Sequence, residues 1–205
     1  MRTLFIPTKL KSKINKSKIL EISKRLPKSI AITYSIQYIN QAKEIKDLLK
    51  QKHKITKFIQ VLGCSKPVLP KITQAILLIS DGRFHAISLS IETKLPVYIL
   101  NRNKLELISN KDTETLKKRK KASYVKFLNA DKIGILISTK PGQENLKRAL
   151  ELKKKLNDKT SYLFICNNIN TNEFENFPQM QSWVNTACPR LDMDEGSVLN
   201  VDQIK

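Results

Sequence analysis

The stretch AILLISDGRFH at residues 75–85 decides the fold. It begins with an uninterrupted apolar run, AILLI, of the kind found in a strand buried on both faces of a parallel sheet. Gly82 then permits a turn, and the residues that follow, as far as Ile91, have the pattern of a short helix. A buried strand that passes directly into a helix indicates an α/β fold.

The same alternation extends in both directions from this stretch. Upstream we expect strands at 3–7, 29–35 and 58–63, with helices at 14–26 and around 45–49. Downstream we expect strands at 97–100, 133–139, 161–166 and 183–186, with helices at 112–129, 144–156 and 172–177. Strands that alternate with helices imply mostly parallel sheets with right-handed crossovers.

The repeated pattern predicts two related small parallel-sheet α/β modules. We expect the division at the end of the lysine-rich helix, which gives modules at 1–129 and 130–205. In each module a strand leads into a cysteine that is followed closely by proline, at Cys64 and at Cys188. Ligands of parallel sheets bind beyond the carboxyl ends of the strands, so these loops are the candidate site.

Composition limits the class of protein. The net charge is +20, which would attract phosphate groups or acidic protein surfaces. The basic residues are mostly lysines on expected helix faces, and aromatic residues make up only 6% of the chain, so a direct nucleic-acid target is not favoured. No apolar run of about 18 residues and no secretory signal occur, and we therefore expect a cytoplasmic protein without a membrane partner.

The three cysteines are an odd number and form no CxxC pair, which argues against a disulfide framework and against a local zinc or cluster motif. Cys64 and Cys188 are so far apart in sequence that they suit one metal ligand per module. The alternative is that each is a small, half-buried residue. Cys166 ends an apolar strand, so we expect it in the core.

Two further loops carry polar side chains with a plausible chemistry. Arg83 offers a bidentate fork for a carboxylate, and His85 is either a ligand or base, or the partner in a local hydrogen bond. TKPGQ at 139–143 lacks the spacing of a phosphate loop. Its Gln143 either orients a ligand or belongs to a plain helix-capping turn. No pattern of hydrolase residues appears.

Taken together, six segments resemble one family in order and separation, the 2-(3-amino-3-carboxypropyl)histidine synthases of diphthamide synthesis. The segments are QVLGC at 60–64, DGRFHAISL at 81–89, LPVYIL at 95–100, TKPGQ at 139–143, NFP at 176–178 and VNTACPR at 184–190. The resemblance covers essentially the whole chain, and DGRFH and VNTACPR are its specific parts.

This resemblance implies a transferase. In the family, three related α/β modules each give one cysteine to a 4Fe-4S cluster, whose fourth iron receives S-adenosylmethionine. The 3-amino-3-carboxypropyl group is then transferred by radical chemistry to a histidine of translation elongation factor 2. Position by position, Cys64 resembles the ligand of the second module and Cys188 that of the third, whereas Cys166 matches none. By the same resemblance, Arg83, His85, Gln143 and Arg190 border the cofactor pocket.

The family has a further amino-terminal module with the first ligand cysteine, and this chain resembles only the second and third. Three explanations compete: a separately encoded module or homologous subunit, a truncated gene model, or a degenerate subunit that supports an active partner. We favour the separate subunit because both cysteine loops are intact. The alternatives from other functional classes are a non-catalytic basic protein that binds RNA or the ribosome, and a scaffold that binds elongation factor 2 without catalysis.

Overall fold

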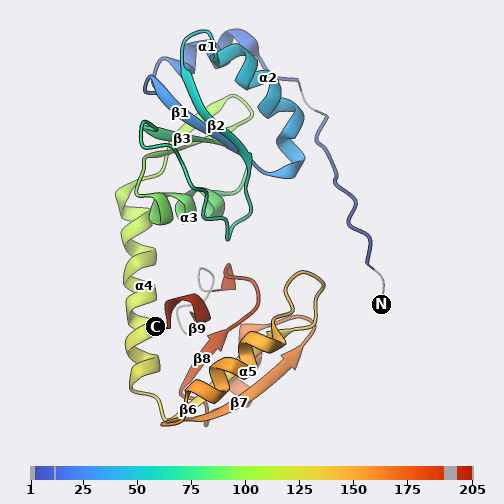
Figure 1. Ribbon diagram of the computed structural model, residues 1–205, viewed down its shortest axis with the longest axis vertical. Coiled ribbons are helices and arrows are strands. Elements are labelled where there is room, and N and C mark those ends of the chain that lie inside the picture. Colours follow the sequence, from blue (N-terminus) through green and yellow to red (C-terminus); the bar gives the residue numbers. More distant parts are fainter. Residues whose placement is uncertain (1–2, 12, 192–197, 205) are drawn as a thin grey trace. The chain divides into compact units, whose positions relative to one another are not determined.

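The computed structural model describes residues 3–11, 13–191 and 198–204, which form two compact units, Met1–Thr113 and Glu114–Lys205 (Figure 1). The division lies inside the long helix α4 (Asn110–Leu128), whereas the sequence indicated the end of that helix. Tyr124 and Phe127 pack into the core of the second unit, so the greater part of α4 belongs there.

The first unit is a five-stranded sheet with helices on both faces. Its strand order is β2-β1-β3-β4-β5, with the first four strands parallel and β5 antiparallel to β4. The elements are α1 (Lys16–Ser23), β1 (Ser29–Tyr34), η1 (Ile36–Tyr38), α2 (Ile39–Leu49), β2 (Lys54–Gln60), β3 (Ala75–Ile79), α3 (Arg83–Thr93), β4 (Val97–Asn101) and β5 (Lys104–Leu107).

The apolar run AILLI forms β3, and every one of its residues is buried. Because successive strand side chains point to opposite faces, Leu77 and Ile79 pack with α1 and α2, whereas Ile76 and Leu78 pack with α3. Figure 1 shows α1 and α2 on one side of this sheet and α3 on the other. The three layers explain why this strand is apolar on both faces.

The second unit is a four-stranded, fully parallel sheet in the order β7-β6-β8-β9. Its central strand β6 pairs with β7 and β8. One face packs against α4 and α5, and the other carries an aromatic cluster around Trp183. The elements after α4 are β6 (Lys132–Ser138), α5 (Leu146–Lys155), β7 (Thr160–Cys166), η2 (Thr171–Asn176), β8 (Ser182–Asn185), β9 (Val198–Asn200) and η3 (Val201–Gln203).

The two parallel α/β sheets confirm the predicted fold class. The strand expected at 3–7 was wrong: that segment has no regular structure, and its apolar side chains are exposed, with Leu4 at 82%. Two short strands, β5 and β9, were not predicted. Among the described residues, no helix combines the length and the apolar character needed to cross a bilayer.

Candidate functional site

Cys64 lies in the loop that follows β2, at the carboxyl edge of the first sheet, and its side chain is exposed. A tight turn holds this loop: the backbone N–H of Leu62 donates to Ser65 Oγ at 2.7 Å, and the N–H of Ser65 donates to the carbonyl of Leu62 at 3.0 Å. The hydrogen bonds thus fix the residues around the cysteine.

Gly63 brings the Cys64 loop against the start of α3. A Cβ at this position would lie 1.7 Å from Cε1 of Phe84, so only glycine allows the backbone to approach the ring so closely. The Phe84 ring in turn makes an edge contact with the ring of His85, with centroids 5.4 Å apart. Two segments singled out from the sequence, QVLGC and DGRFH, are therefore adjacent in the first unit.

His85 is half-buried in the first turn of α3. A Cβ on Gly82 would come within 3.1 Å of its Nδ1, which places the imidazole over the glycine that precedes the helix. The backbone N–H of Gly82 donates to Ser80 Oγ at 3.3 Å. His53, the other histidine, has its Nδ1 2.9 Å from the carbonyl of Pro27 and lies away from the Cys64 loop, at the start of β2.

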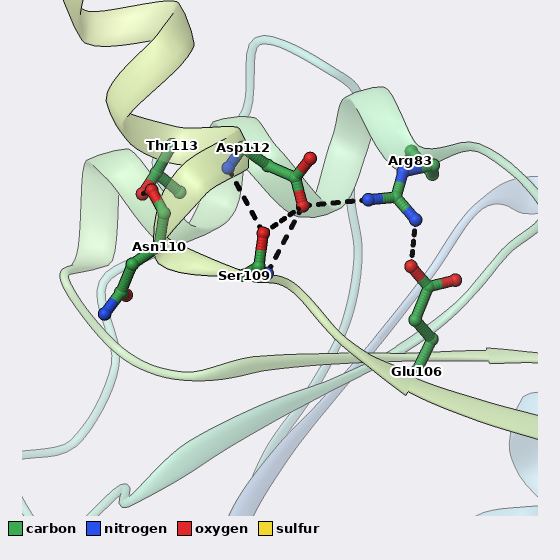
Figure 2. A network of polar contacts seen from close by, with 6 residues as sticks. All are labelled: Arg83, Glu106, Ser109, Asn110, Asp112 and Thr113. Atoms are coloured by element: carbon green, nitrogen blue, oxygen red, sulfur yellow. Dashed lines mark hydrogen bonds and ion pairs between the residues drawn. The ribbon is translucent and has the colours of Figure 1, made fainter.

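The guanidinium of Arg83 contacts two carboxylates within the first unit. Nη1 bonds to Glu106 of β5, and Nη2 donates to Oδ2 of Asp112 at 2.8 Å (Figure 2). The same Asp112 oxygen accepts from Ser109 Oγ at 2.7 Å. This hydrogen bond from Ser109, together with the nearby Arg83 charge, lowers the pKa of Asp112. Arg83 therefore ties the start of α3 to β5 and to the first turn of α4.

A second polar group at this edge, which was not predicted from the sequence, is formed by Tyr38 and Asp81. The Tyr38 phenol lies near the Asp81 carboxylate; burial first, and then this neighbouring charge, raises the pKa of Tyr38. Both residues line a cavity of about 470 Å³, which is also lined by Lys18, Ile99, Asn101, Arg102, Asn103, Lys104 and Glu106. Asp81 was visible as part of DGRFH, but no spacing in the sequence connects it with Tyr38.

In the second unit, Cys188 occupies the corresponding place beyond the end of β8, and its side chain is half-buried. The buried side chain of Asn185 donates through Nδ2 to the carbonyl of Cys188 at 2.8 Å and accepts the N–H of Ala187 at 2.9 Å. Nδ2 of Asn200, from the end of β9, donates to the carbonyl of Pro189 at 2.9 Å. Side-chain amides thus hold the loop around the cysteine.

Gln143 lies in the turn after β6 and not in the helix that follows. Gly142 adopts φ +79°, a left-handed conformation that favours glycine, and the N–H of Gln143 donates to the carbonyl of Lys140 at 3.0 Å. The N-cap of α5 is Asn145, whose Nδ2 instead donates to the carbonyl of Thr186 at 2.8 Å. The TKPGQ turn and the Cys188 loop are therefore both at the carboxyl edge of the second sheet, connected through Asn145.

The remaining candidates differ in exposure. Arg190 is exposed, two residues after Cys188. Cys166 ends β7 and is half-buried, and burial raises the pKa of its thiol. Its carbonyl accepts the N–H of Thr139 at 2.9 Å, so this residue is part of the sheet edge. Cys166 is therefore half-buried at the end of an edge strand and not in the core, where the sequence led us to expect it.

Each unit therefore presents one thiol in a loop beyond the carboxyl edge of a parallel sheet. Thiolates are the usual ligands of iron–sulfur clusters, so Cys64 and Cys188 have the right donor chemistry. Within the described parts of the chain, no group of three or more histidine, cysteine or acidic side chains is placed to hold a metal ion.

The sequence model of the family described as “diphthamide synthesis protein” matches residues 1–200. The 2-(3-amino-3-carboxypropyl)histidine synthase of Pyrococcus horikoshii is 31% identical over 209 residues, which are 94% of this chain and 60% of the relative. Subunit 1 of the synthase from Schizosaccharomyces pombe is 27% identical, across 82% of this chain and 43% of the relative. The chain thus spans 60% or less of the length of these two curated relatives.

Solved structures agree with this result. The crystal structure of Dph2 from Pyrococcus horikoshii matches with a TM-score of 0.79 and 26% identity, over 94% of this chain and 62% of that chain. A crystal structure of the same protein with a 4Fe-4S cluster matches with the same score. The parallel α/β architecture described above is therefore that of a known fold.

Proposed function

The chain belongs to the diphthamide synthesis protein family, and from this premise we propose that it is part of a 2-(3-amino-3-carboxypropyl)histidine synthase. The proposed reaction transfers a 3-amino-3-carboxypropyl group from S-adenosylmethionine to a histidine of translation elongation factor 2. The proposed location is the cytoplasm, because that is where a translation factor acts. Family membership and the matching fold support the proposal. The thiols of Cys64 and Cys188 also support it, because thiolates are the usual ligands of iron–sulfur clusters.

We propose that Cys64 and Cys188 each ligate one iron of a 4Fe-4S cluster. The observation that carries this assignment is their shared position: each thiol lies in a loop beyond the carboxyl edge of its parallel sheet, where ligands of such sheets bind. When bound, such a cluster supplies the electron that breaks the bond between the sulfur and the aminocarboxypropyl carbon of S-adenosylmethionine. A third thiolate comes from outside these 205 residues, on a cysteine-bearing module or homologous subunit.

The polar residues around the two loops have different proposed tasks. His85, Gln143 and Arg190 are proposed to face S-adenosylmethionine, since each lies in or next to a loop at the carboxyl edge of its sheet. Arg83 is proposed to act indirectly. Its guanidinium is engaged by Glu106 and Asp112, so it holds the start of α3 and thereby the Cys64 loop that packs on Phe84.

Release of methylthioadenosine tests the proposal directly. The complex is purified anaerobically from its own cells, reduced, and supplied with S-adenosylmethionine and elongation factor 2. We expect release by the unmodified complex and by the Cys166→Ala control, and loss of at least tenfold in Cys64→Ala and Cys188→Ala. A complex that binds elongation factor 2 but releases no methylthioadenosine would be a scaffold, and the catalytic proposal would be wrong.

The charge of α4 favours a second candidate function, binding of RNA or the ribosome. Residues 117–121 of this helix are all lysine or arginine, and most of them are exposed. Phosphate contacts make affinity fall steeply with salt. If RNA binding is the function, affinity for RNA will depend on salt and will be unchanged in Cys188→Ala. Under the synthase proposal the same substitution abolishes methylthioadenosine release.

A further inference from the structure

We infer that Asn145, Asn185 and Asn200 are positioning residues that hold the Cys188 loop, residues 186–189, in its ligating shape before any metal binds. The inference rests on the proposed role of Cys188 as an iron ligand. It goes beyond that role because it assigns a task to three side chains that do not ligate. Its basis is the pattern of hydrogen bonds at the carboxyl edge of the second sheet.

Every residue of the Cys188 loop is held through its backbone by one of these amides. The carbonyl of Thr186 accepts from Asn145, and the N–H of Ala187 donates to Asn185. The carbonyl of Cys188 accepts from Asn185, and that of Pro189 accepts from Asn200. The four distances lie between 2.8 and 2.9 Å. These hydrogen bonds restrain the backbone on both sides of the cysteine.

Asn185 is the centre of this network. Its Nδ2 donates both to the Cys188 carbonyl and to Oδ1 of Asn200 at 2.6 Å, while its own Oδ1 accepts from Ala187. It is 1% exposed, and Asn200 is 5% exposed. A buried amide that loses its hydrogen-bond partner is destabilising, so the two side chains support each other. Aspartate has the same shape but lacks the donors, so it cannot replace asparagine at residue 185.

The network also joins three separate elements at the cysteine. Asn145 precedes α5, Asn185 ends β8 and Asn200 ends β9. A further bond, from Thr186 Oγ1 to the carbonyl of Leu136 at 2.8 Å, ties the loop to the central strand β6. Side chains that orient metal ligands without touching the metal have large effects on metal affinity. Here the loop loses its conformational entropy when the chain folds, so metal binding does not have to order it.

Alkylation of the metal-free chain tests the inference without requiring activity. Iodoacetamide labelling is followed by mass spectrometry at each cysteine, in Asn185→Ala, Asn200→Ala and the exposed control Asn168→Ala. We expect Cys188 to label about tenfold faster in the first two variants, because each loses at least one hydrogen bond to the loop. Cys64, in the other unit, provides the internal standard and should change less than twofold. Cys188 labelling at the unmodified rate in both variants would overturn the inference.

General opening of the second unit would give a different pattern, because Cys166 at the end of β7 would then label faster too. In that case the milder Asn145→Ala variant decides, since its side chain makes a single described bond to the loop. Acceleration at Cys188 alone supports the inference, and no acceleration overturns it.

Iron content separates this inference from the proposed function. We expect the purified Asn185→Ala complex to lose iron, with the Asn168→Ala complex retaining it. If Cys188→Ala keeps its full iron content, the ligand assignment is wrong, whereas the labelling result still decides whether the amides hold the loop. If Cys188→Ala loses iron and Asn185→Ala does not, the ligand assignment stands and the positioning role is wrong.

Discussion

The two units present a cysteine at the same place in a parallel sheet but hold it by different means. In the first unit, Cys64 is exposed on a short turn that rests on the ring of Phe84. In the second, Cys188 is half-buried in a loop fixed by the amides of Asn185 and Asn200. The position of each cysteine is therefore set by topology, whereas the rigidity of its loop depends on local side chains. We expect the second unit to be the more sensitive to substitution.

The largest expected effect comes from the aromatic cluster of the second unit. Trp183 is 4% exposed, stacks on Phe174 at 4.1 Å and meets the edge of Phe164 at 4.7 Å. Trp183→Ala should lower the free energy of unfolding of this unit by about 3–5 kcal/mol. Phe58→Ala, which removes the half-buried partner of Tyr34 in the first unit, should cost clearly less. Urea unfolding followed by circular dichroism measures both, and equal losses would contradict the comparison.

Gly134 and Gly63, which face a tryptophan and a phenylalanine ring, should show a smaller difference in stability between the units, again with the larger loss in the second unit. A Cβ on Gly134 would lie 2.3 Å from Trp183 Cε3, in a ring enclosed by its cluster, so Gly134→Ala should cost about 1–3 kcal/mol. Gly63→Ala meets Phe84, which is only half-buried and can rotate away, so its cost should be lower. Trp183 is the sole tryptophan, so its fluorescence in urea reports the second unit alone. A shift of that transition by Gly63→Ala would show that the units are not independent.

The smallest effect is expected at Arg83. Its ion pairs with Glu106 and Asp112 are exposed and should contribute only about 0.2–1 kcal/mol. The pKa of Asp112 is lowered from its ordinary value of 3.8 in the folded chain, so its stabilising contribution is present above that pH. It is lost as the pH falls through the lower folded value.

Arg83→Gln should therefore destabilise the first unit slightly at neutral pH and lose less stability on acidification than the unmodified chain. Urea unfolding at pH 7 and at pH 3 measures this difference. The matched control is Lys50→Gln, which removes another surface ion pair, the one between Lys50 and Asp47. An identical pH dependence of Arg83→Gln and the unmodified chain would show that the Arg83 pairs are not formed in solution.

The sequence predicted the parallel α/β class and most of the elements, because buried strands such as β3 are apolar on both faces. It failed where an element is short or polar. The strand β5, KLEL, is exposed at all but one residue, and β9 has only three residues. The strand expected at 3–7 was wrong because apolar residues form a strand only when a neighbouring strand supplies the ladder, and there this segment has none among the described residues.

For the candidate site, the sequence located the loops but not their contacts. Cys64 and Cys188 were recognisable as residues beyond strand ends, and both lie there. The engagement of Arg83 by Glu106 and Asp112 depends on three elements meeting, and no local spacing encodes it. Asn200 contacts Pro189 in the Cys188 loop although the two residues are 11 positions apart in the sequence. Polar contacts between distant segments are settled by tertiary packing.

Iron content of the anaerobically purified complex tests the central claim most directly. We predict that Cys64→Ala and Cys188→Ala each lose most of their iron, because each removes one of the thiolates that hold the cluster. Cys166→Ala, which removes a half-buried thiol from the end of β7, should keep the iron of the unmodified complex. Full iron in either of the first two variants would show that its cysteine is not a ligand and would contradict the account.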